Sequence, residues 1–180
     1  MDIANPSEEH SMLREMVRDF VNEFVEPQAL EHDRDEKFNL ELLRSMGDMG
    51  LLGLTVDESY GGAGLDATAA VIVHEELSAS DPGFALAHLA HSMLFVNNLE
   101  QNGSDEQRSL IMPKVCSGEW ISAMAMSEPD VGTDVMGLST TAEINSDGNW
   151  VINGRKMWIT NGCLDAVSYT HLRAHETAYY

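Results

Sequence analysis

Residues 118–134 read GEWISAMAMSEPDVGTD, and the spacing of the apolar residues changes within this stretch. Before it, apolar side chains recur every three or four positions, as on the buried face of a helix. From Ile121 onward the spacing approaches two, and the run 121–126 predicts a β-strand of small and apolar residues. The sequence therefore predicts an α+β chain that changes from helix to strand near Glu119.

Five helices are expected in the first part of the chain, because capping residues and helix breakers divide it into five periodic segments. These helices are expected to run from Asn5 to about Pro27, from Asn39 to Met49, from Asp66 or Thr68 to Ser78, from Asp81 to Asn102 and from Ser104 to about Ser117. Proline lacks the N–H that the helix ladder needs, so Pro27 is expected to end or kink the first helix. The pattern predicts an all-α helical domain over residues 1–119.

An apolar stripe marks the first of these helices. Met12, Met16, Phe20 and Phe24 recur every four residues, and Leu13, Val17 and Val21 lie beside them, which makes the stripe broad. We expect the four-spaced residues to face the core and not a partner groove. The glycine-rich segment YGGAGLD (60–66) lacks the lysine that follows the loop in a P-loop, so we expect it to form tight turns.

Two pairs of histidines are candidates for metal ligands. His88 and His91 lie three residues apart on one expected helix, but no third ligand is placed near them, and a packed or solvated pair is expected. His171 and His175 lie four apart in HLRAHE, with the glutamate outside the pair, which differs from the metalloprotease helix. No metal site is predicted.

Turn signals punctuate the second part of the chain. Asp147-Gly148, Asn153-Gly154 and Asn161-Gly162 follow or separate the β-favouring runs LSTTAEI, NWVI and RKMWIT. Asn-Gly and Asp-Gly favour hairpins because both central residues of the turn need a positive φ. These signals predict an antiparallel meander over residues 120–166, the first strands of a β-domain.

The charge balance excludes some partners. Thirty acidic and 10 basic side chains give a formal net charge of −20, so nucleic acid and anionic membranes should repel the chain. No apolar run approaches the roughly 20 residues that span a bilayer. The polar N-terminus is unlike a signal or transit peptide, and Cys116 and Cys163 suggest no disulfide framework, so a reducing, cytoplasmic setting is expected.

The segment SEPDVGTD (127–134) is the first candidate for chemistry. It combines two hydroxyls, a proline bend and a glycine within eight residues, which suits either a phosphate or heteroaromatic ligand or a plain polar turn. Together, AMAMSEPDVGTD (123–134) and INGRKMWITNG (152–162) resemble the signatures of the acyl-CoA dehydrogenase family. YGGAGLD and NGSDEQRSLIMPKVCSGEW (102–120) match as well, and the resemblance covers about residues 5–166.

The resemblance implies a fold and an activity. It implies an N-terminal helical domain, a middle antiparallel β-barrel-like domain and a C-terminal four-helix bundle, the last of which is absent from this chain. It implies FAD as cofactor and the α,β-dehydrogenation of a short-chain, possibly branched, acyl-CoA, in fatty acid or branched-chain amino acid catabolism. An electron-transferring flavoprotein is the implied electron acceptor and a homotetramer the implied assembly, in the bacterial cytoplasm or the mitochondrial matrix. Oxidases and monooxygenases of the same fold, or a non-enzymatic helical interaction module, are the alternatives.

Site residues follow from the resemblance by position. The expected flavin-binding residues are Met124, Ala125, Met126, Ser127, Gly132, Thr133, Trp158, Ile159 and Thr160. Ser127 is expected at the pyrimidine edge of the flavin, Trp158 against the ring, and the Thr160 hydroxyl near N5. Thr133 is expected to contact both the FAD pyrophosphate and the CoA arm, although it stands where serine is usual, and Asp130 and Val131 replace smaller residues.

The substrate site is less fully represented. FALAHLAHSMLFVNNLEQNG (84–103) resembles the isovaleryl-CoA dehydrogenase branch, which implies that Leu86 and Ala90 close the far end of the acyl pocket. The catalytic glutamate of the family lies in the C-terminal bundle, so no catalytic base is assigned, and Glu128 is expected to be a loop residue.

The last residues depart from all these patterns. Residues 167–177, VSYTHLRAHET, have neither apolar alternation nor turn signals. They resemble a translated sequencing adapter, and residues 167–180 are predicted to be a non-native tail, the alternative being a natural divergent terminus.

Overall fold

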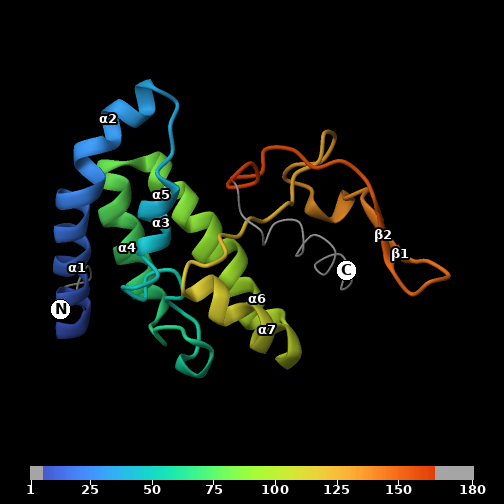
Figure 1. Cartoon of the computed structure of the whole chain (residues 1–180), viewed down its shortest axis with the longest axis horizontal. Coiled ribbons are helices and arrows are strands. Elements are labelled where there is room, and N and C mark those ends of the chain that lie inside the picture. Colours follow the sequence, from blue (N-terminus) through green and yellow to red (C-terminus); the bar gives the residue numbers. More distant parts are fainter. Residues whose placement is uncertain (1–5, 165–180) are drawn as a thin grey trace.

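The computed structural model describes residues 6–164, so the predictions for Asn5 and for residues 167–180 lie outside the described residues. In the described part, helices gather at one end of the molecule and a β-hairpin extends at the other (Figure 1). The α+β class, with helices first and an antiparallel sheet after them, is confirmed. No helix within residues 6–164 is both long and apolar enough to cross a membrane.

The helical part contains α-helices joined in two places by π-helical turns. The α-helices are α1 (Glu8–Phe20), α2 (Glu26–Arg34), α3 (Leu40–Ser45), α4 (Ala67–Ser80), α5 (Pro82–Leu89), α6 (Asn98–Asn102) and α7 (Asp105–Cys116). The π-helical turns are η1 (Val21–Val25) and η3 (Ala90–Asn97), and a 3-10 turn, η2, covers Glu58–Tyr60.

Side-chain caps begin most of these helices where the sequence predicts them. Asn39, Asp66 and Asp81 each accept a hydrogen bond from the backbone N–H three residues on, and Ser104 forms a capping box with Gln107. The first helix instead begins after Ser7, whose hydroxyl accepts from the N–H of His10 at 3.2 Å. Such caps satisfy N–H groups that have no partner inside the helix.

Of the two outcomes predicted for Pro27, an end or a kink of the first helix, the end is wrong. The chain remains helical through Pro27 to Arg34, because the preceding turn, η1, is widened to π geometry. The N–H of Glu26 donates to Val21 O, five residues back, and Pro27 then occupies the first turn of α2, where a missing N–H costs little. A similar widened turn, η3, makes one continuous helix of α5 and α6.

The core lies between α1, α4 and α5, and it uses only part of the predicted broad stripe of the first helix. Phe20 is buried, but Met12 is 65% exposed, and Met16 and Phe24 are also exposed. The buried column of this helix is the adjacent one, which contains Val17, Val21 and Val25. Both columns are apolar, and α4 covers only one of them.

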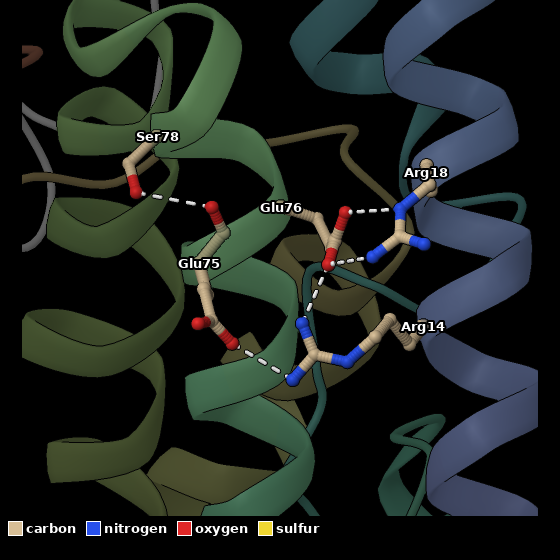
Figure 2. A network of polar contacts seen from close by, with 5 residues as sticks. All are labelled: Arg14, Arg18, Glu75, Glu76 and Ser78. Atoms are coloured by element: carbon tan, nitrogen blue, oxygen red, sulfur yellow. Dashed lines mark hydrogen bonds and ion pairs between the residues drawn. The ribbon is translucent and has the colours of Figure 1, made fainter. Parts of the chain in front are cut away.

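A partly buried ion-pair network fixes α1 against α4 (Figure 2). Arg18 binds the carboxylate of Glu76 through Nε and Nη2, both at 2.9 Å, and Arg14 binds the same carboxylate and that of Glu75. Hydrogen bonds from Arg18 and Arg14 lower the pKa of Glu76. A carboxylate shared by two guanidinium groups fixes how far the two helices are shifted along each other.

The described β-structure is one hairpin. Strands β1 (Thr141–Ile144) and β2 (Trp150–Asn153) pair antiparallel, with Thr141 opposite Asn153 and Ile144 opposite Trp150. The turn predicted at Asp147-Gly148 is confirmed, and Gly148 has a φ of +79°.

The strands predicted at 121–126 and in RKMWIT (155–160) are wrong. Both segments are irregular connections without strand pairing, and Trp158 in the second has a left-handed φ of +59°. The short 3-10 turn η4 (Val135–Gly137) separates the first of them from the hairpin. Apolar alternation indicates an extended chain, but a strand also needs a neighbour that completes its backbone hydrogen bonds. These two segments are held by side chains.

Candidate functional site

The two motifs that the sequence singles out meet in space. The N–H of Met157 donates to Ser127 O at 3.0 Å, which joins the segment 155–160 to the segment 123–134. Lys156 Nζ donates to Met126 O at 3.1 Å and to Glu128 Oε1 at 2.9 Å. Residues about 30 positions apart in the sequence thus form one site.

Glu128 is the polar centre of this junction. Its carboxylate accepts from the N–H and hydroxyl of Ser139, both at 2.7 Å, from the N–H of Thr140 at 3.0 Å, and from Lys156. The side chain is only 2% exposed. Hydrogen bonds from Thr140, Lys156 and Ser139 hold the pKa of Glu128 far below its usual range. A carboxylate so fully bonded is a weak proton acceptor.

The backbone of the first motif closes into a tight turn. Glu128 and Val131 exchange two backbone hydrogen bonds, at 2.9 and 3.2 Å, with Pro129 and Asp130 between them. Gly132 and Thr133 follow the turn and are exposed, and a Cβ at Gly132 would meet no atom within 4 Å. The loop is therefore open on the side where the sequence predicts a cofactor phosphate.

The second motif has a strained backbone. Trp158 and Asn161 both lie in the left-handed region, with φ of +59° and +66°. A bulky residue in this region is a rare arrangement that costs free energy, and such strain concentrates at functional sites. The Trp158 side chain is 84% exposed, whereas Ile159 and Thr160 are half-buried.

Asn161 connects the second motif to the helical part. Its side-chain amide donates to Ala87 O on α5 at 2.9 Å and to Ser122 O at 3.1 Å. Ser122 in turn donates its N–H to His91 Nδ1 at 3.0 Å. Sequence reasoning missed Asn161 and Lys156 as polar anchors; the only signal was their position at the two ends of the apolar run MWIT.

The expected cofactor ligands present unused donors. Within residues 6–164, the hydroxyls of Ser127, Thr133 and Thr160 make no hydrogen bond to another side chain or backbone group. Ser127 and Thr160 lie on the two segments that the Met157–Ser127 bond joins. Hydroxyls without a partner and an exposed aromatic ring on these two segments are groups that suit a flavin ring and its phosphates, so these residues fit FAD.

The two residues expected to line the acyl pocket have different environments. Leu86 on α5 is 53% exposed, while Ala90, the first residue of η3, is buried. Their joint role at the end of a pocket stays a prediction.

The histidines of the helical part are packed, as expected. His88 and His91 are fully buried, with Nε2 of His88 donating to Leu51 O at 2.8 Å and Nε2 of His91 to Val115 O at 3.1 Å. His88 Nδ1 also lies 3.0 Å from His74 Nε2. Among residues 6–164, no group of three potential ligands is arranged to hold a metal ion.

The glycine-rich loop 60–66 forms tight turns, as predicted. Gly61 and Gly64 have φ of +88° and +62°. Gly62 has no space for a side chain, because a Cβ there would collide with the carbonyl of Val56. The two cysteines are both free; burial raises the pKa of the Cys116 thiol to about 11, and Cys163 is exposed.

Comparison with known proteins gives two family matches. The family described as "Acyl-CoA dehydrogenase, N-terminal domain" matches residues 7–119, and "Acyl-CoA dehydrogenase, middle domain" matches residues 123–178. Among curated proteins, mitochondrial isovaleryl-CoA dehydrogenase of Pongo abelii is 42% identical over 158 residues. That alignment covers 87% of this chain and 37% of the relative, so the chain spans little more than a third of the relative's length.

Solved structures give the same result. The acyl-CoA dehydrogenase of Bacillus anthracis, in complex with FAD, is 36% identical with a TM-score of 0.80, over 90% of this chain and 28% of that one. A chain from the study of the electron transferring flavoprotein of Acidaminococcus fermentans is 32% identical with a TM-score of 0.85, over 92% of this chain and 43% of that one.

Proposed function

The chain belongs to the acyl-CoA dehydrogenase family, and on this basis we propose that it holds part of an FAD site and that the whole protein oxidises an acyl-CoA between its α- and β-carbons. The observation that carries the proposal is the junction of the two motifs through Met157 and Ser127, with the hydroxyls of Ser127 and Thr160 unused beside it.

The residues of this junction suit the redox chemistry. When bound, FAD supplies the acceptor for the hydride that leaves the β-carbon. The Ser127 and Thr160 hydroxyls are fixed donors at the site where negative charge would develop, and fixed donors in a partly desolvated place stabilise charge without reorganisation. With FAD bound, the exposed Trp158 side chain would pack against the flavin ring, and Gly132 and Thr133 would hold its phosphates.

The described residues contribute binding and orientation more than proton transfer. Glu128, the carboxylate next to the first motif, is occupied by Lys156, Ser139 and Thr140. An α-proton acceptor needs a pKa near neutrality, which burial without a cation favours. We assign no catalytic base to residues 6–164, and we propose that the base lies in a part of the whole protein that this chain does not include.

We further propose a short, branched acyl-CoA as substrate and an electron-transferring flavoprotein as electron acceptor. The 42% identity to an isovaleryl-CoA dehydrogenase supports the first, and the similarity to a chain from an electron transferring flavoprotein study supports the second. A homo-oligomer, and a cytoplasmic or mitochondrial matrix location, are proposed on the family alone. No observation favours the oxidase, monooxygenase or interaction-module alternatives.

The test is spectroscopic and uses the full-length protein. We expect purified protein to carry the visible absorption of oxidised flavin, and isovaleryl-CoA to bleach it under anaerobic conditions. The bleaching rates with straight-chain acyl-CoAs, compared with the rate with isovaleryl-CoA, show whether the protein prefers a branched substrate. Oxygen consumption separates an oxidase from a dehydrogenase. A flavin that no short or branched acyl-CoA bleaches would rule the proposal out.

A further inference from the structure

We propose that Lys156 and Asn161 are positioning residues that clamp the segment Met157–Thr160 at both of its ends. Lys156 immediately precedes the segment and Asn161 immediately follows it, and each binds the backbone of the segment 122–128. The meaning for the reaction rests on the proposed function, because Trp158 and Thr160 lie between the two clamps.

The first clamp is an ion pair with little exposure. Lys156 is 10% exposed, and its ammonium group bridges Met126 O and the Glu128 carboxylate. Glu128 is itself fixed by Ser139 and Thr140. Since a buried ammonium needs both a counter-ion and hydrogen-bond acceptors, Lys156 has one favourable position, and this position fixes the start of the segment.

The second clamp depends on two properties of one residue. Asn161 uses the two hydrogens of one amide group for Ala87 O and Ser122 O, and its backbone φ of +66° directs the side chain toward them. Asparagine tolerates this backbone region better than other residues that carry a side chain. Ala87 lies on α5, so this clamp fixes the end of the segment to the helical part.

The clamps are needed because the backbone alone does not fix the segment. One backbone hydrogen bond, from Met157 to Ser127, links the segments 123–134 and 155–160, and neither segment contains one of the strands β1 and β2. A single bond leaves the segment free to rotate or shift, and Trp158 would relax from its φ of +59°. Two side-chain clamps, on either side, restrict both movements.

Loss of a clamp should therefore disturb chemistry more than substrate affinity. A displacement of about 1 Å at a reacting group is sufficient to slow a reaction on the order of 100-fold, whereas contacts elsewhere on the substrate are unchanged. We expect loss of either clamp to slow flavin reduction by about 10-fold or more, with little change in KM.

The test uses four variants at the two clamps and one control variant, in the full-length protein and in the 180-residue chain. Asn161→Asp keeps the shape but removes both donors; Asn161→Gly keeps the backbone conformation without the amide. Lys156→Met removes the first clamp, and Lys156→Arg tests rescue by a conserved charge. Asn102→Asp is the matched control, because Asn102 also donates to backbone but lies on exposed α6, away from the site.

Two measurements separate the clamps from the proposed function. In the full-length protein, reduction kinetics and the flavin absorbance spectrum should change in Asn161→Asp, Asn161→Gly and Lys156→Met, and far less in Lys156→Arg and Asn102→Asp. In the 180-residue chain, hydrogen exchange at the Met157 amide should accelerate in the same three variants.

Each outcome decides one of the two ideas. The proposal of the two clamps is wrong if wild-type protein binds flavin, substrate reduces that flavin, and the three variants show the same reduction rate and the same spectrum. If wild-type protein holds no flavin, the proposed function fails, and exchange at Met157 still decides whether the clamps exist. Where Asn161→Asp does not fold, Asn161→Gly and Lys156→Met give the answer.

Discussion

Ser122 donates both its backbone N–H and its hydroxyl to Nδ1 of His91, at 3.0 and 2.9 Å. His91 therefore accepts at Nδ1 and donates from Nε2 to Val115 O, which requires a neutral ring. A second buried histidine, His88, also donates from Nε2 to a carbonyl. Two neutral, buried imidazoles make the stability of the helical part sensitive to acid.

The first prediction concerns pH. Burial lowers the pKa of His88 to about 3 and that of His91 to about 4, from an ordinary 6.5. Below pH 6.5 these histidines take up protons in the unfolded chain but stay neutral in the folded chain. Their contribution to the unfolding free energy is therefore fully present above pH 6.5 and declines as the pH falls from 6.5 toward 4. Each histidine contributes up to about 1.4 kcal/mol per pH unit in this window. Urea unfolding at pH 7 and pH 5 measures the decline, and His91→Gln should make it shallower; an unchanged slope contradicts the assignment.

The second prediction concerns Glu128. Glu128→Gln leaves the buried Lys156 ammonium without its counter-ion and should cost about 3 kcal/mol in unfolding free energy. The double variant Glu128→Gln with Lys156→Met should recover part of this loss, because no buried charge remains. Denaturant melts of both single variants and the double variant give the coupling. Strictly additive losses would mean that the pair is not coupled.

The third prediction concerns the shared carboxylate of the helical part. Glu76→Gln should destabilise the fold by about 2 kcal/mol, because Arg14 and Arg18 lose the charge that they share. Glu75→Gln is the matched control: its side chain is 61% exposed, so its pair with Arg14 should contribute less than about 1 kcal/mol. Equal effects of the two substitutions on thermal unfolding would disprove the difference.

The fourth prediction compares two glycines. Gly62→Ala should destabilise the chain by about 2 kcal/mol or more, because the new Cβ collides with the backbone of Val56. Gly132→Ala should change the unfolding free energy by less than about 0.5 kcal/mol, since nothing lies within 4 Å of the new atom. Urea unfolding of the two variants checks this, and a tolerated alanine at position 62 would show that the loop can move aside.

The fifth prediction concerns the Thr160 hydroxyl in the full-length enzyme. Thr160→Val should slow flavin reduction more than it weakens FAD binding, by about 1–3 kcal/mol in the barrier, because it removes one donor from a fixed position. Stopped-flow reduction and FAD titration measure the two effects. Thr141→Val, on exposed β1, is the control, and equal reduction rates in wild type and Thr160→Val would remove the proposed role.

Local chemistry made much of the fold predictable. Asn39, Asp66, Asp81 and Ser104 begin helices because their side chains satisfy N–H groups within three residues, and such interactions are readable from sequence. The turn at Gly148 is readable for the same reason. The junction of the two motifs, through Met157 and Ser127, was expected only through the family resemblance.

Features that depend on distant contacts were not predictable. Pro27 could be accommodated only if the turn before it widened, and nothing in the adjacent residues indicates that choice. Met12 and Val17 are both apolar, and the tertiary packing of the core decides which is buried. The segment 121–126 alternates like a strand, yet its neighbours are His91 and Asn161, which are remote in sequence.

Ser122 uses all its polar groups to connect the two parts of the chain: its N–H and hydroxyl bind His91, and its carbonyl accepts from Asn161. Ser122 thereby binds both the helical part, through His91 in η3, and the second motif, through Asn161. If η3 unfolds, the contact that supports the second motif is lost as well. The helical part and the motif segment should then melt as one cooperative unit. Destabilising substitutions deep in the helical core would thus loosen the segment Met157–Thr160 before they unfold the hairpin, and heating would disturb this segment by first loosening the helices that support it.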